Sequence, residues 1–192
     1  MIFSSFDILF QNKEAERLVS LLKIMSGFKI AEIGAGKGLL SLYLARVVGQ
    51  DGLVFSTEFD EAKLNKLRTK ITRQKVTNLQ ISQAGADNPN LPDVLFDVIL
   101  MSKVYHHFTN SAAQNKSFYA HLKSEGQLVV VDFEPKWYLK LSTPKGIPAN
   151  YGGHGIYKNV LISEVEKAGF KLKQLNDNFS GGGMFCAIFN KL

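Results

Sequence analysis

Residues 28–38 read Phe28-Lys29-Ile30-Ala31-Glu32-Ile33-Gly34-Ala35-Gly36-Lys37-Gly38, an apolar strand pattern that runs directly into three alternating glycines. Residues 39–48 follow with apolar side chains at helical spacing. Glycines between a strand and a helix let the chain turn tightly and let a ligand approach the backbone amides at the helix N-terminus. The stretch therefore predicts a strand, a turn and a helix, with the turn as a candidate ligand-binding loop.

Two familiar glycine motifs do not match this turn. The dinucleotide-binding fingerprint Gly-x-Gly-x-x-Gly requires a glycine at the position where Leu39 stands. The phosphate-binding P-loop requires Ser or Thr after its lysine, but Gly38 follows Lys37. The turn is therefore either a binding loop of another kind or a purely structural strand-to-helix connection.

Strand and helix patterns alternate on both sides of the glycine turn. Strands are expected at 28–33, 53–57, 79–82, 97–101, 128–131, 170–175 and 184–189. Helices are expected at 15–25, 39–48, 60–73, 112–122 and 161–168. This order predicts an α/β fold with a doubly wound, mainly parallel seven-stranded sheet. The last two strands, joined by Gly181-Gly182-Gly183, are expected to add a C-terminal antiparallel hairpin.

Acidic residues follow the second and third expected strands. Glu58 ends the second strand, where a carboxylate can accept hydrogen bonds from both hydroxyls of a ribose. Asp87 follows the third strand, although an Asx-Pro loop would also explain it. Open α/β sheets bind ligands at the carboxyl ends of their strands, so these loops and the glycine turn predict one nucleoside-type pocket.

Composition and charge exclude several classes of protein. The single cysteine, Cys186, excludes internal disulfides and suits the reducing cytoplasm, which is the expected location. No apolar stretch approaches the ~18 residues of a membrane span, and the first residues lack the basic region of a signal peptide. We therefore expect neither a membrane partner nor secretion.

The net charge of +6 permits nucleic-acid binding but does not favour it. The densest basic cluster comprises Lys63, Lys66, Arg68, Lys70, Arg73 and Lys75. At helical spacing these residues lie beside an apolar stripe, and no aromatic residues are interleaved to stack on bases. A solvent-exposed helix face explains the cluster more simply.

From about residue 28 onward, the sequence resembles the class I S-adenosylmethionine-dependent methyltransferases of the small-molecule type. The resemblance rests on the glycine turn, Glu58, Asp87-Asn88 with Leu91-Pro92, the run from Phe96-Asp97 to His106-His107, the run from Gly126 to Asp132, and Glu166 to Phe170. It implies S-adenosylmethionine as cofactor, with the glycine turn against the methionine part, Glu58 on the ribose hydroxyls and Asp87 on the adenine amino group. The cofactor-binding residues that we expect are Glu32, Gly34, Gly36, Gly38, Glu58, Phe59, Asp87, Asn88 and Ser102.

Methyl transfer is an in-line displacement at a sulfonium carbon, so the enzyme mainly aligns the acceptor and excludes water. His106 and His107 follow the fourth strand and are the candidate catalytic residues, because a histidine can accept a proton or hold the acceptor. Neutral histidines that only pack are the alternative. No metal site is expected, since the four histidines and one cysteine show no recognisable ligand spacing.

The segment 133–155 is rich in proline, glycine and aromatic residues and is expected to overhang the same mouth. Its aromatic side chains either form an apolar wall of the acceptor pocket or simply pack the loop down. The expected substrate-binding residues are Tyr105, Trp137, Tyr151 and His154.

The length of 192 residues fits one domain. Within it we expect a helical cap at 1–27, a cofactor-binding half at 28–132, and a substrate-side loop, helix and hairpin at 133–192. The expected function is methyl transfer to a small molecule. The alternatives are an RNA or protein methyltransferase, or a protein that binds the cofactor without transferring its methyl group. The sequence predicts no particular oligomeric state.

Overall fold

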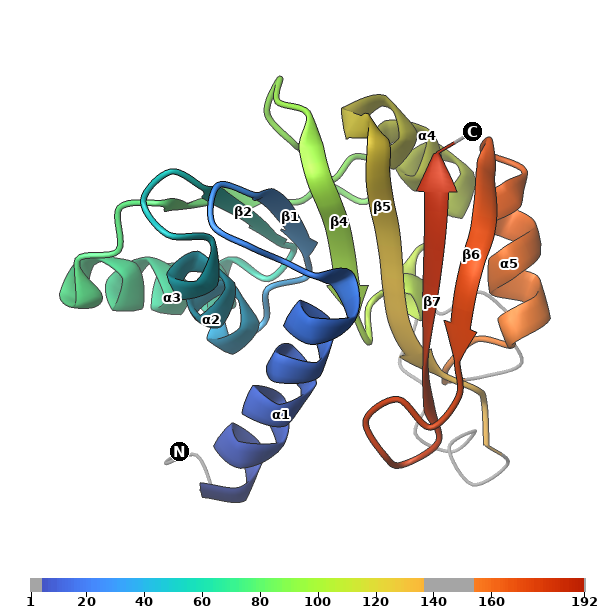
Figure 1. Ribbon diagram of the computed structural model, residues 1–192, viewed down its shortest axis with the longest axis horizontal. Helices are drawn as coiled ribbons and strands as arrows, with labels where there is room; N and C mark the ends of the chain where they lie inside the picture. The colour runs from blue at the N-terminus through green and yellow to red at the C-terminus, as the bar shows by residue number, and fades with distance from the viewer. Residues whose placement is uncertain (1–4, 137–153, 192) are drawn as a thin grey trace.

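The computed structural model describes residues 5–136 and 154–191, and within them a seven-stranded sheet forms the centre of the molecule (Figure 1). The strands are β1 (Lys29–Ile33), β2 (Leu53–Glu58), β3 (Leu79–Gln83), β4 (Phe96–Ser102), β5 (Leu122–Phe133), β6 (Phe170–Asn176) and β7 (Met184–Lys191). Their spatial order is β3-β2-β1-β4-β5-β7-β6. The first five strands of the chain are parallel, and β7 runs antiparallel between β5 and β6. The predicted fold class is confirmed.

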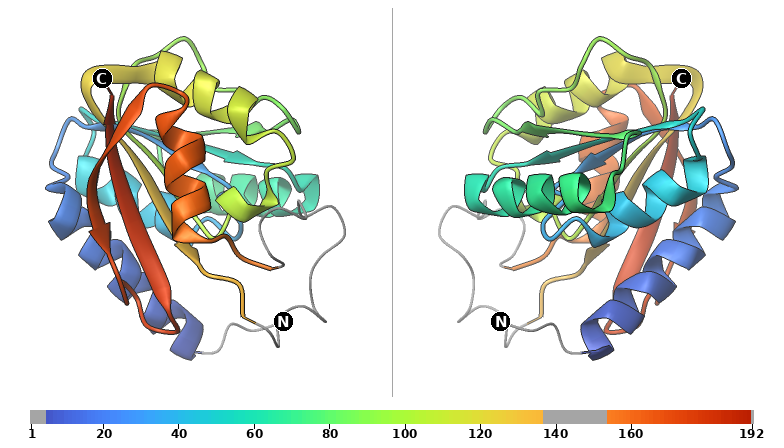
Figure 2. Two further views of the ribbon diagram at one scale, coloured as in Figure 1. Left: turned by 90° about the vertical axis from the view of Figure 1, so that its right-hand side faces the viewer. Right: turned by 90° about the vertical axis from the view of Figure 1, so that its left-hand side faces the viewer.

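Helices cover both faces of the sheet. They are α1 (Ser5–Leu22), α2 (Leu39–Val48), α3 (Glu61–Gln74), a short 3-10 helix η1 (Tyr105–His107), α4 (Ser111–His121) and α5 (Lys158–Glu166). One apolar core joins α1, α2 and α3 to one face, and a second joins α4 and α5 to the other, so α1 and α5 lie on opposite sides (Figure 2). Among the described helices, none combines the length and the apolar character needed to cross a membrane.

The central strands are buried on both faces because they lie between these two helical layers. In β4, Val98 and Leu100 pack into the first core, while Ile99 and Met101 pack into the second. Continuous apolar runs of this kind are typical of central parallel strands. The same alternation fixes the register, which aligns Ile33 of β1 with Thr57 of β2 and Met101 of β4. The loops after these three strands therefore leave the sheet at one edge.

The basic residues of α3 face outward, as the charge pattern predicts. Asp60 caps the helix by accepting hydrogen bonds from the backbone amides of Ala62 and Lys63, at 2.9 and 3.2 Å. Leu64 and Leu67 are buried against the sheet, and the basic stripe lies on the opposite, mostly exposed side of the helix. The cluster is a solvated helix face.

The N-terminal helix differs from its predicted range, 15–25. The helix ends at Leu22 because Lys23 adopts a left-handed conformation with φ 52°, and the amide of Ile24 then donates to the carbonyl of Val19 at 3.0 Å. This hydrogen bond caps the carboxyl end of the helix. Arg17 anchors the helix to the loop between β6 and β7, where its guanidinium donates to the carbonyl of Phe179 and lies 4.7 Å from the centre of that ring.

Strand β5 is longer than the predicted range 128–131. It begins at Leu122, directly after α4, because Leu122 pairs with Phe96 of β4 before the register shifts between Phe96 and Val98. Gly126 lies inside the strand, where a Cβ atom would come within 3.0 Å of the Phe96 carbonyl oxygen. The glycine is therefore needed for close approach of two strands and not for a turn.

We expect the thiol of Cys186 to be unreactive in the folded protein. The residue is fully buried on β7, and burial raises the pKa of its thiol to about 12 from 9.0. This shift lowers the thiolate fraction at neutral pH by about 1,000-fold, and the thiolate is the reactive form. Ellman's reagent should therefore label the native protein far more slowly than the protein unfolded in guanidinium chloride. Equal labelling rates in the two states would contradict this burial.

Candidate active site

A cavity of about 300 Å³ opens at the carboxyl ends of β1 and β4, beside the glycine turn. This volume is at the lower end of the range for small-molecule sites. The lining residues come from α1, β1, the glycine turn, α2, α3 and the end of β4: Glu14, Ala15, Glu32, Gly34, Ala35, Gly36, Lys37, Leu39, Leu40, Lys63, Ser102 and Lys103. Four predicted cofactor-binding residues, Glu32, Gly34, Gly36 and Ser102, are thus brought together.

The three glycines of the turn have positive φ angles but different surroundings. A Cβ atom on Gly34 would lie 2.4 Å from a methyl carbon of Val104, and one on Gly38 would lie 2.2 Å from a methyl carbon of Leu67. These two glycines are required by packing. Gly36 has a φ of +54° and lines the cavity, and within the described part of the chain no atom outside its two neighbours lies within 4 Å of the position of a Cβ. Its bare backbone is open to a ligand, which is what a cofactor cradle requires.

Glu58 is held against the glycine turn. One of its carboxylate oxygens accepts a hydrogen bond from the amide of Gly36 at 2.7 Å, and the other accepts one from the amide of Asp60 at 2.9 Å. Each oxygen of a carboxylate has a further lone pair that can accept from a hydroxyl. The next side chain, Phe59, is 67% exposed, so its ring is available to a planar ligand.

The structure does not bring Asp87 and Asn88 into the cavity. Both are exposed in the loop after β3, where the Asn88 side chain accepts a hydrogen bond from the amide of Asn90 at 2.9 Å. The loop is closed by a bond of 2.8 Å from the amide of Gly85 to the carbonyl of Asn88. These contacts explain the loop without a ligand, so a role in adenine binding remains a proposal.

Glu32 places a buried carboxylate at the base of the cavity. One of its oxygens accepts hydrogen bonds from the hydroxyl of Ser56, at 2.9 Å, and from the hydroxyl of Ser41. Burial raises the pKa of this carboxyl, and the negative charge of Glu58 raises it further. A carboxylate in this position can pair with a cationic group of a bound ligand.

We expect Glu32→Gln to change how stability depends on pH. Because the pKa of Glu32 is raised above 4.5 by burial, the folded state keeps this proton at pH values where the unfolded state has lost it. The free energy of unfolding of the wild type should therefore fall, relative to the variant, as the pH rises from about 4.5 through the raised pKa. Urea unfolding of both proteins across the acidic and neutral range measures this difference. If the difference in unfolding free energy between the two proteins did not vary with pH, the pKa of Glu32 would not be raised in the folded state.

Glu14 of α1 was not predicted as a site residue, although it closes one side of the cavity. It is 5% exposed, accepts a hydrogen bond of 2.6 Å from the hydroxyl of Ser102, and lies 3.4 Å from the ammonium of Lys103. In the sequence it lies at helical spacing from Leu18 and Leu22, on the buried side of α1. An acidic residue in line with an apolar stripe was the signal that would have identified it.

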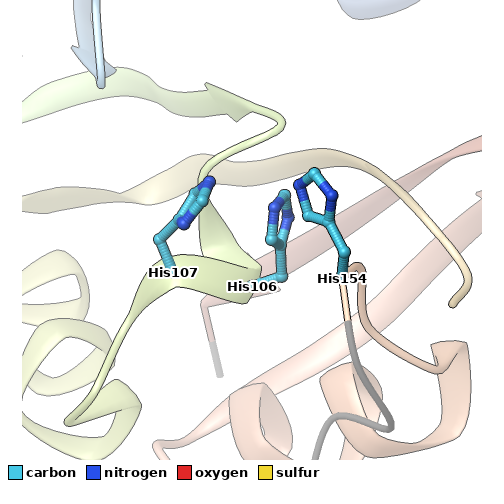
Figure 3. A group of neighbouring side chains, drawn as sticks. All are labelled: His106, His107 and His154. Atoms are coloured by element: carbon cyan, nitrogen blue, oxygen red, sulfur yellow. The ribbon is translucent and has the colours of Figure 1, made fainter. Parts of the chain in front are cut away.

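Three imidazoles lie together where the chain leaves β4. His106 and His107 form most of η1, and His154 comes from the segment before α5. The ring of His106 lies between the other two (Figure 3), with centroid distances of 4.1 Å to His107 and 5.1 Å to His154. One ring nitrogen from each histidine can be chosen so that all lie within 4.8 Å of one another. The histidines will be called the imidazole cluster.

Asp132 orients the central ring of the cluster. Its two carboxylate oxygens lie 2.8 and 3.0 Å from Nδ1 of His106, and both residues are buried. The backbone amides of His106 and Phe133 donate to the same carboxylate, at 3.3 and 2.9 Å. A carboxylate that only accepts keeps the proton on Nδ1 and leaves the lone pair on Nε2. Asp132 ends the run from Gly126 that carries the family resemblance, but it was not among the predicted site residues. Its charge at the end of an apolar central strand is the sequence feature that indicates a functional role.

The cluster follows the cavity along the chain, and the pKa values of its two outer rings are lowered. Partial desolvation of its ring and, next in size, the electrostatic effect of His106 together lower the pKa of His107 to about 4, although part of the side chain is exposed. Burial also lowers the pKa of His154. The charge of Lys63, which lines the cavity, contributes to the lowered pKa of His107, so these two side chains lie close enough to interact. The chain itself links the two features through Ser102 and Lys103.

The substrate role expected of Tyr105 does not fit the structure. Its side chain is fully buried, its hydroxyl donates to the carboxylate of Glu164 at 3.1 Å, and the amide of Asn115 donates to that hydroxyl at 2.8 Å. These contacts make Tyr105 part of the core between α4 and α5. Trp137 and Tyr151, also expected to bind the substrate, lie outside the described residues.

Solved structures with the same fold include methyltransferases. A SAM-dependent methyltransferase from Aquifex aeolicus aligns over all of both chains with a TM-score of 0.78 and 18% identity. The cyclase SpnF aligns over 92% of this chain and 81% of its own, with a TM-score of 0.71 and 13% identity. At these identities the similarity establishes the fold alone.

A sequence relative is the ubiquinone/menaquinone biosynthesis C-methyltransferase UbiE of Vibrio vulnificus. It is 29% identical over 117 residues, which make up 60% of this chain and 45% of the relative. The chain thus spans less than half the length of this relative. The aligned region leaves more than half of the relative unmatched.

The seven-stranded fold and the cavity at its glycine turn define an S-adenosylmethionine-dependent methyltransferase of class I. Residues 30–126 match the methyltransferase domain family, and the chain belongs to that family. The predicted class and the cofactor of that class, S-adenosylmethionine, are thereby confirmed. The fit of the cofactor is supported by the open backbone of Gly36 in the cavity.

Proposed function

We propose that the protein transfers the methyl group of S-adenosylmethionine to a small-molecule acceptor that is held at the imidazole cluster. The observation that carries this proposal is the continuity of the two halves of the site. The cavity at the glycine turn ends at Ser102 and Lys103, and η1 with its histidines follows directly. A methyl group carried in the cavity would face an acceptor at the cluster.

We propose that the cofactor is held by the glycine turn and by two carboxylates. The bare backbone of Gly36 would lie against the methionine part, and Glu32 would pair with the cationic amino group of that part. Glu58 would accept from the ribose hydroxyls with its remaining lone pairs, and the exposed ring of Phe59 would stack on the adenine. The bound cofactor supplies a methyl group attached to a positively charged sulfur.

On the acceptor side, we propose that the chain positions the nucleophile and receives its proton. Asp132 fixes the Nδ1–H form of His106, so Nε2 presents a lone pair that can take up a proton lost by the acceptor. His107 and His154 border the same place, where their ring nitrogens could help to hold the acceptor. Most of the barrier is lowered by alignment of the acceptor with the methyl group.

A small acceptor fits the surface better than a nucleic acid does. The basic residues of α3 are spread along an exposed helix face, and only Lys63 among them lines the cavity. The similarity to a C-methyltransferase of quinone biosynthesis also supports a small acceptor.

The test is to incubate the protein with S-adenosylmethionine that carries tritium in its methyl group, together with a metabolite extract. We expect label in a low-mass product, and no label with the Gly36→Val variant as the matched blank. Label in RNA or protein fractions would instead support the macromolecular alternative. Cofactor binding by calorimetry with no label in any fraction would show a protein that binds the cofactor without transferring its methyl group, and would overturn the proposal.

A further inference from the structure

We propose that His106, His107 and His154 form a binding site for one divalent transition-metal ion of the zinc class. The cluster offers one ring nitrogen from each residue, all within 4.8 Å of one another. The spacing of these histidines along the chain does not indicate a metal site, because His154 reaches the other two only in the folded protein (Figure 3).

Two ring nitrogens in the cluster are buried without a hydrogen-bond partner among the described residues. They are Nε2 of His106, in a side chain that is 1% exposed, and Nδ1 of His154. A buried polar atom without a partner has lost its hydration with nothing in return, so such atoms are rare in folded proteins. A metal ion bound by these two nitrogens would supply the missing partner to both.

The buried carboxylate of Asp132 lies where it can accept a hydrogen bond from a histidine that binds a metal through its other ring nitrogen. Metal-binding histidines usually donate their other ring N–H to a carboxylate or carbonyl oxygen, which fixes the ring and makes the ligating nitrogen more basic. Asp132 does this for His106, with distances of 2.8 and 3.0 Å to Nδ1. The lone pair of Nε2 is therefore preoriented, whether or not the neighbouring histidines move.

The donor set determines the class of ion. Three neutral imidazoles suit zinc and its neighbours in the first transition series, whereas magnesium and calcium prefer oxygen ligands. A tetrahedral ion with bonds of 2.0–2.1 Å would draw the nitrogens to about 3.4 Å from one another. His106 is fixed by Asp132, but His107 is exposed and His154 is half-buried, so both can close the remaining distance.

Three protein ligands leave one tetrahedral position open, as in catalytic zinc sites. If the acceptor lies at the cluster, which rests on the proposed function, its own oxygen, nitrogen or sulfur atom would occupy that position. Coordination and proton uptake use the same lone pair of His106. With the ion bound, the acceptor would lose its proton to solvent because the ion lowers its pKa, and His106 would act as a ligand.

The test measures metal binding in the absence of cofactor and acceptor, so it can fail while methyl transfer stands. The tag-free protein is stripped with a chelator and titrated with Co²⁺, whose visible absorption reports nitrogen ligation, and then with Zn²⁺ in competition. We expect one equivalent to bind. Separate His107→Ala and His154→Ala variants should each weaken binding at least about 10-fold. Asp132→Asn should weaken it by roughly 10–100-fold.

His121→Ala is the matched control, because His121 lies at the end of α4 and bonds to the carbonyl of Ser117 at 2.8 Å. This variant should bind the ion like the wild type. His107→Ala and His154→Ala alter side chains that are not fully buried, so they test the site even if a change at His106 prevents folding. The proposal is overturned if no Co²⁺ spectrum appears, or if the ion binds equally well to the wild type and to both variants.

Discussion

Gly36→Val is expected to lower the affinity for S-adenosylmethionine by about 100-fold or more, a loss of about 2.7 kcal/mol of binding free energy. Among the residues that the structure describes, no atom outside the chain neighbours lies within 4 Å of the Cβ position, so the first atom of the new side chain meets open space inside the fold. It would instead occupy the space through which the cofactor approaches the backbone. Calorimetric titration with S-adenosylmethionine, and with its demethylated product, measures the loss.

The backbone cost of this change needs its own control. Gly36 has φ +54°, where a residue with a side chain is strained by roughly 1–2 kcal/mol. Gly182 has φ +63°, also has no atom within 4 Å of its Cβ position, and lies in the turn between β6 and β7. Gly182→Val should therefore lose similar stability while binding the cofactor like the wild type. Undiminished binding by Gly36→Val would show that the cofactor lies elsewhere.

Most of the fold could be predicted from the sequence because its signals are local. The strands between the two helical layers carry continuous apolar runs, and α3 carries a capping aspartate followed by a buried stripe. The end of α1 was predicted wrongly because Ile24 and Met25 continue an apolar pattern beyond the helix. The left-handed conformation of Lys23 ends the helix, and nothing in the residue type requires it.

The two halves of the site differ in how well the sequence reveals them. The glycine turn and Glu58 follow consecutive strands, and the parallel register aligns the ends of those strands. The imidazole cluster has no such local rule. His154 reaches His106 because Ile156 donates to the carbonyl of Phe133 at 2.9 Å and Gly155, at φ +114°, lets the chain pass close to that carbonyl. These are tertiary contacts that no spacing in the sequence encodes.

His106→Ala is expected to lower turnover on an identified acceptor by roughly 10²–10⁴-fold, the usual contribution of a positioned acid or base. The ring contacts Asp132 and the other two imidazoles and is not among the residues that line the cavity at the glycine turn, so the affinity for S-adenosylmethionine should stay close to that of the wild type. Single-turnover rates with the labelled cofactor, together with calorimetric affinities, separate the two effects. Circular dichroism should show that the variant is folded.

Asp132→Asn tests the lone pair on Nε2 of His106 without removing the imidazole ring. An amide in place of the carboxylate can donate to Nδ1 of His106, which moves the ring proton to Nε2 and abolishes the lone pair there. Turnover should fall in this variant as in His106→Ala, and the double variant should be no slower than the slower single variant, because both changes remove one function. His121→Ala should remain at the wild-type rate. If Asp132→Asn and His106→Ala both retain wild-type turnover, the buried pair only packs, and the acceptor must lie away from the imidazole cluster.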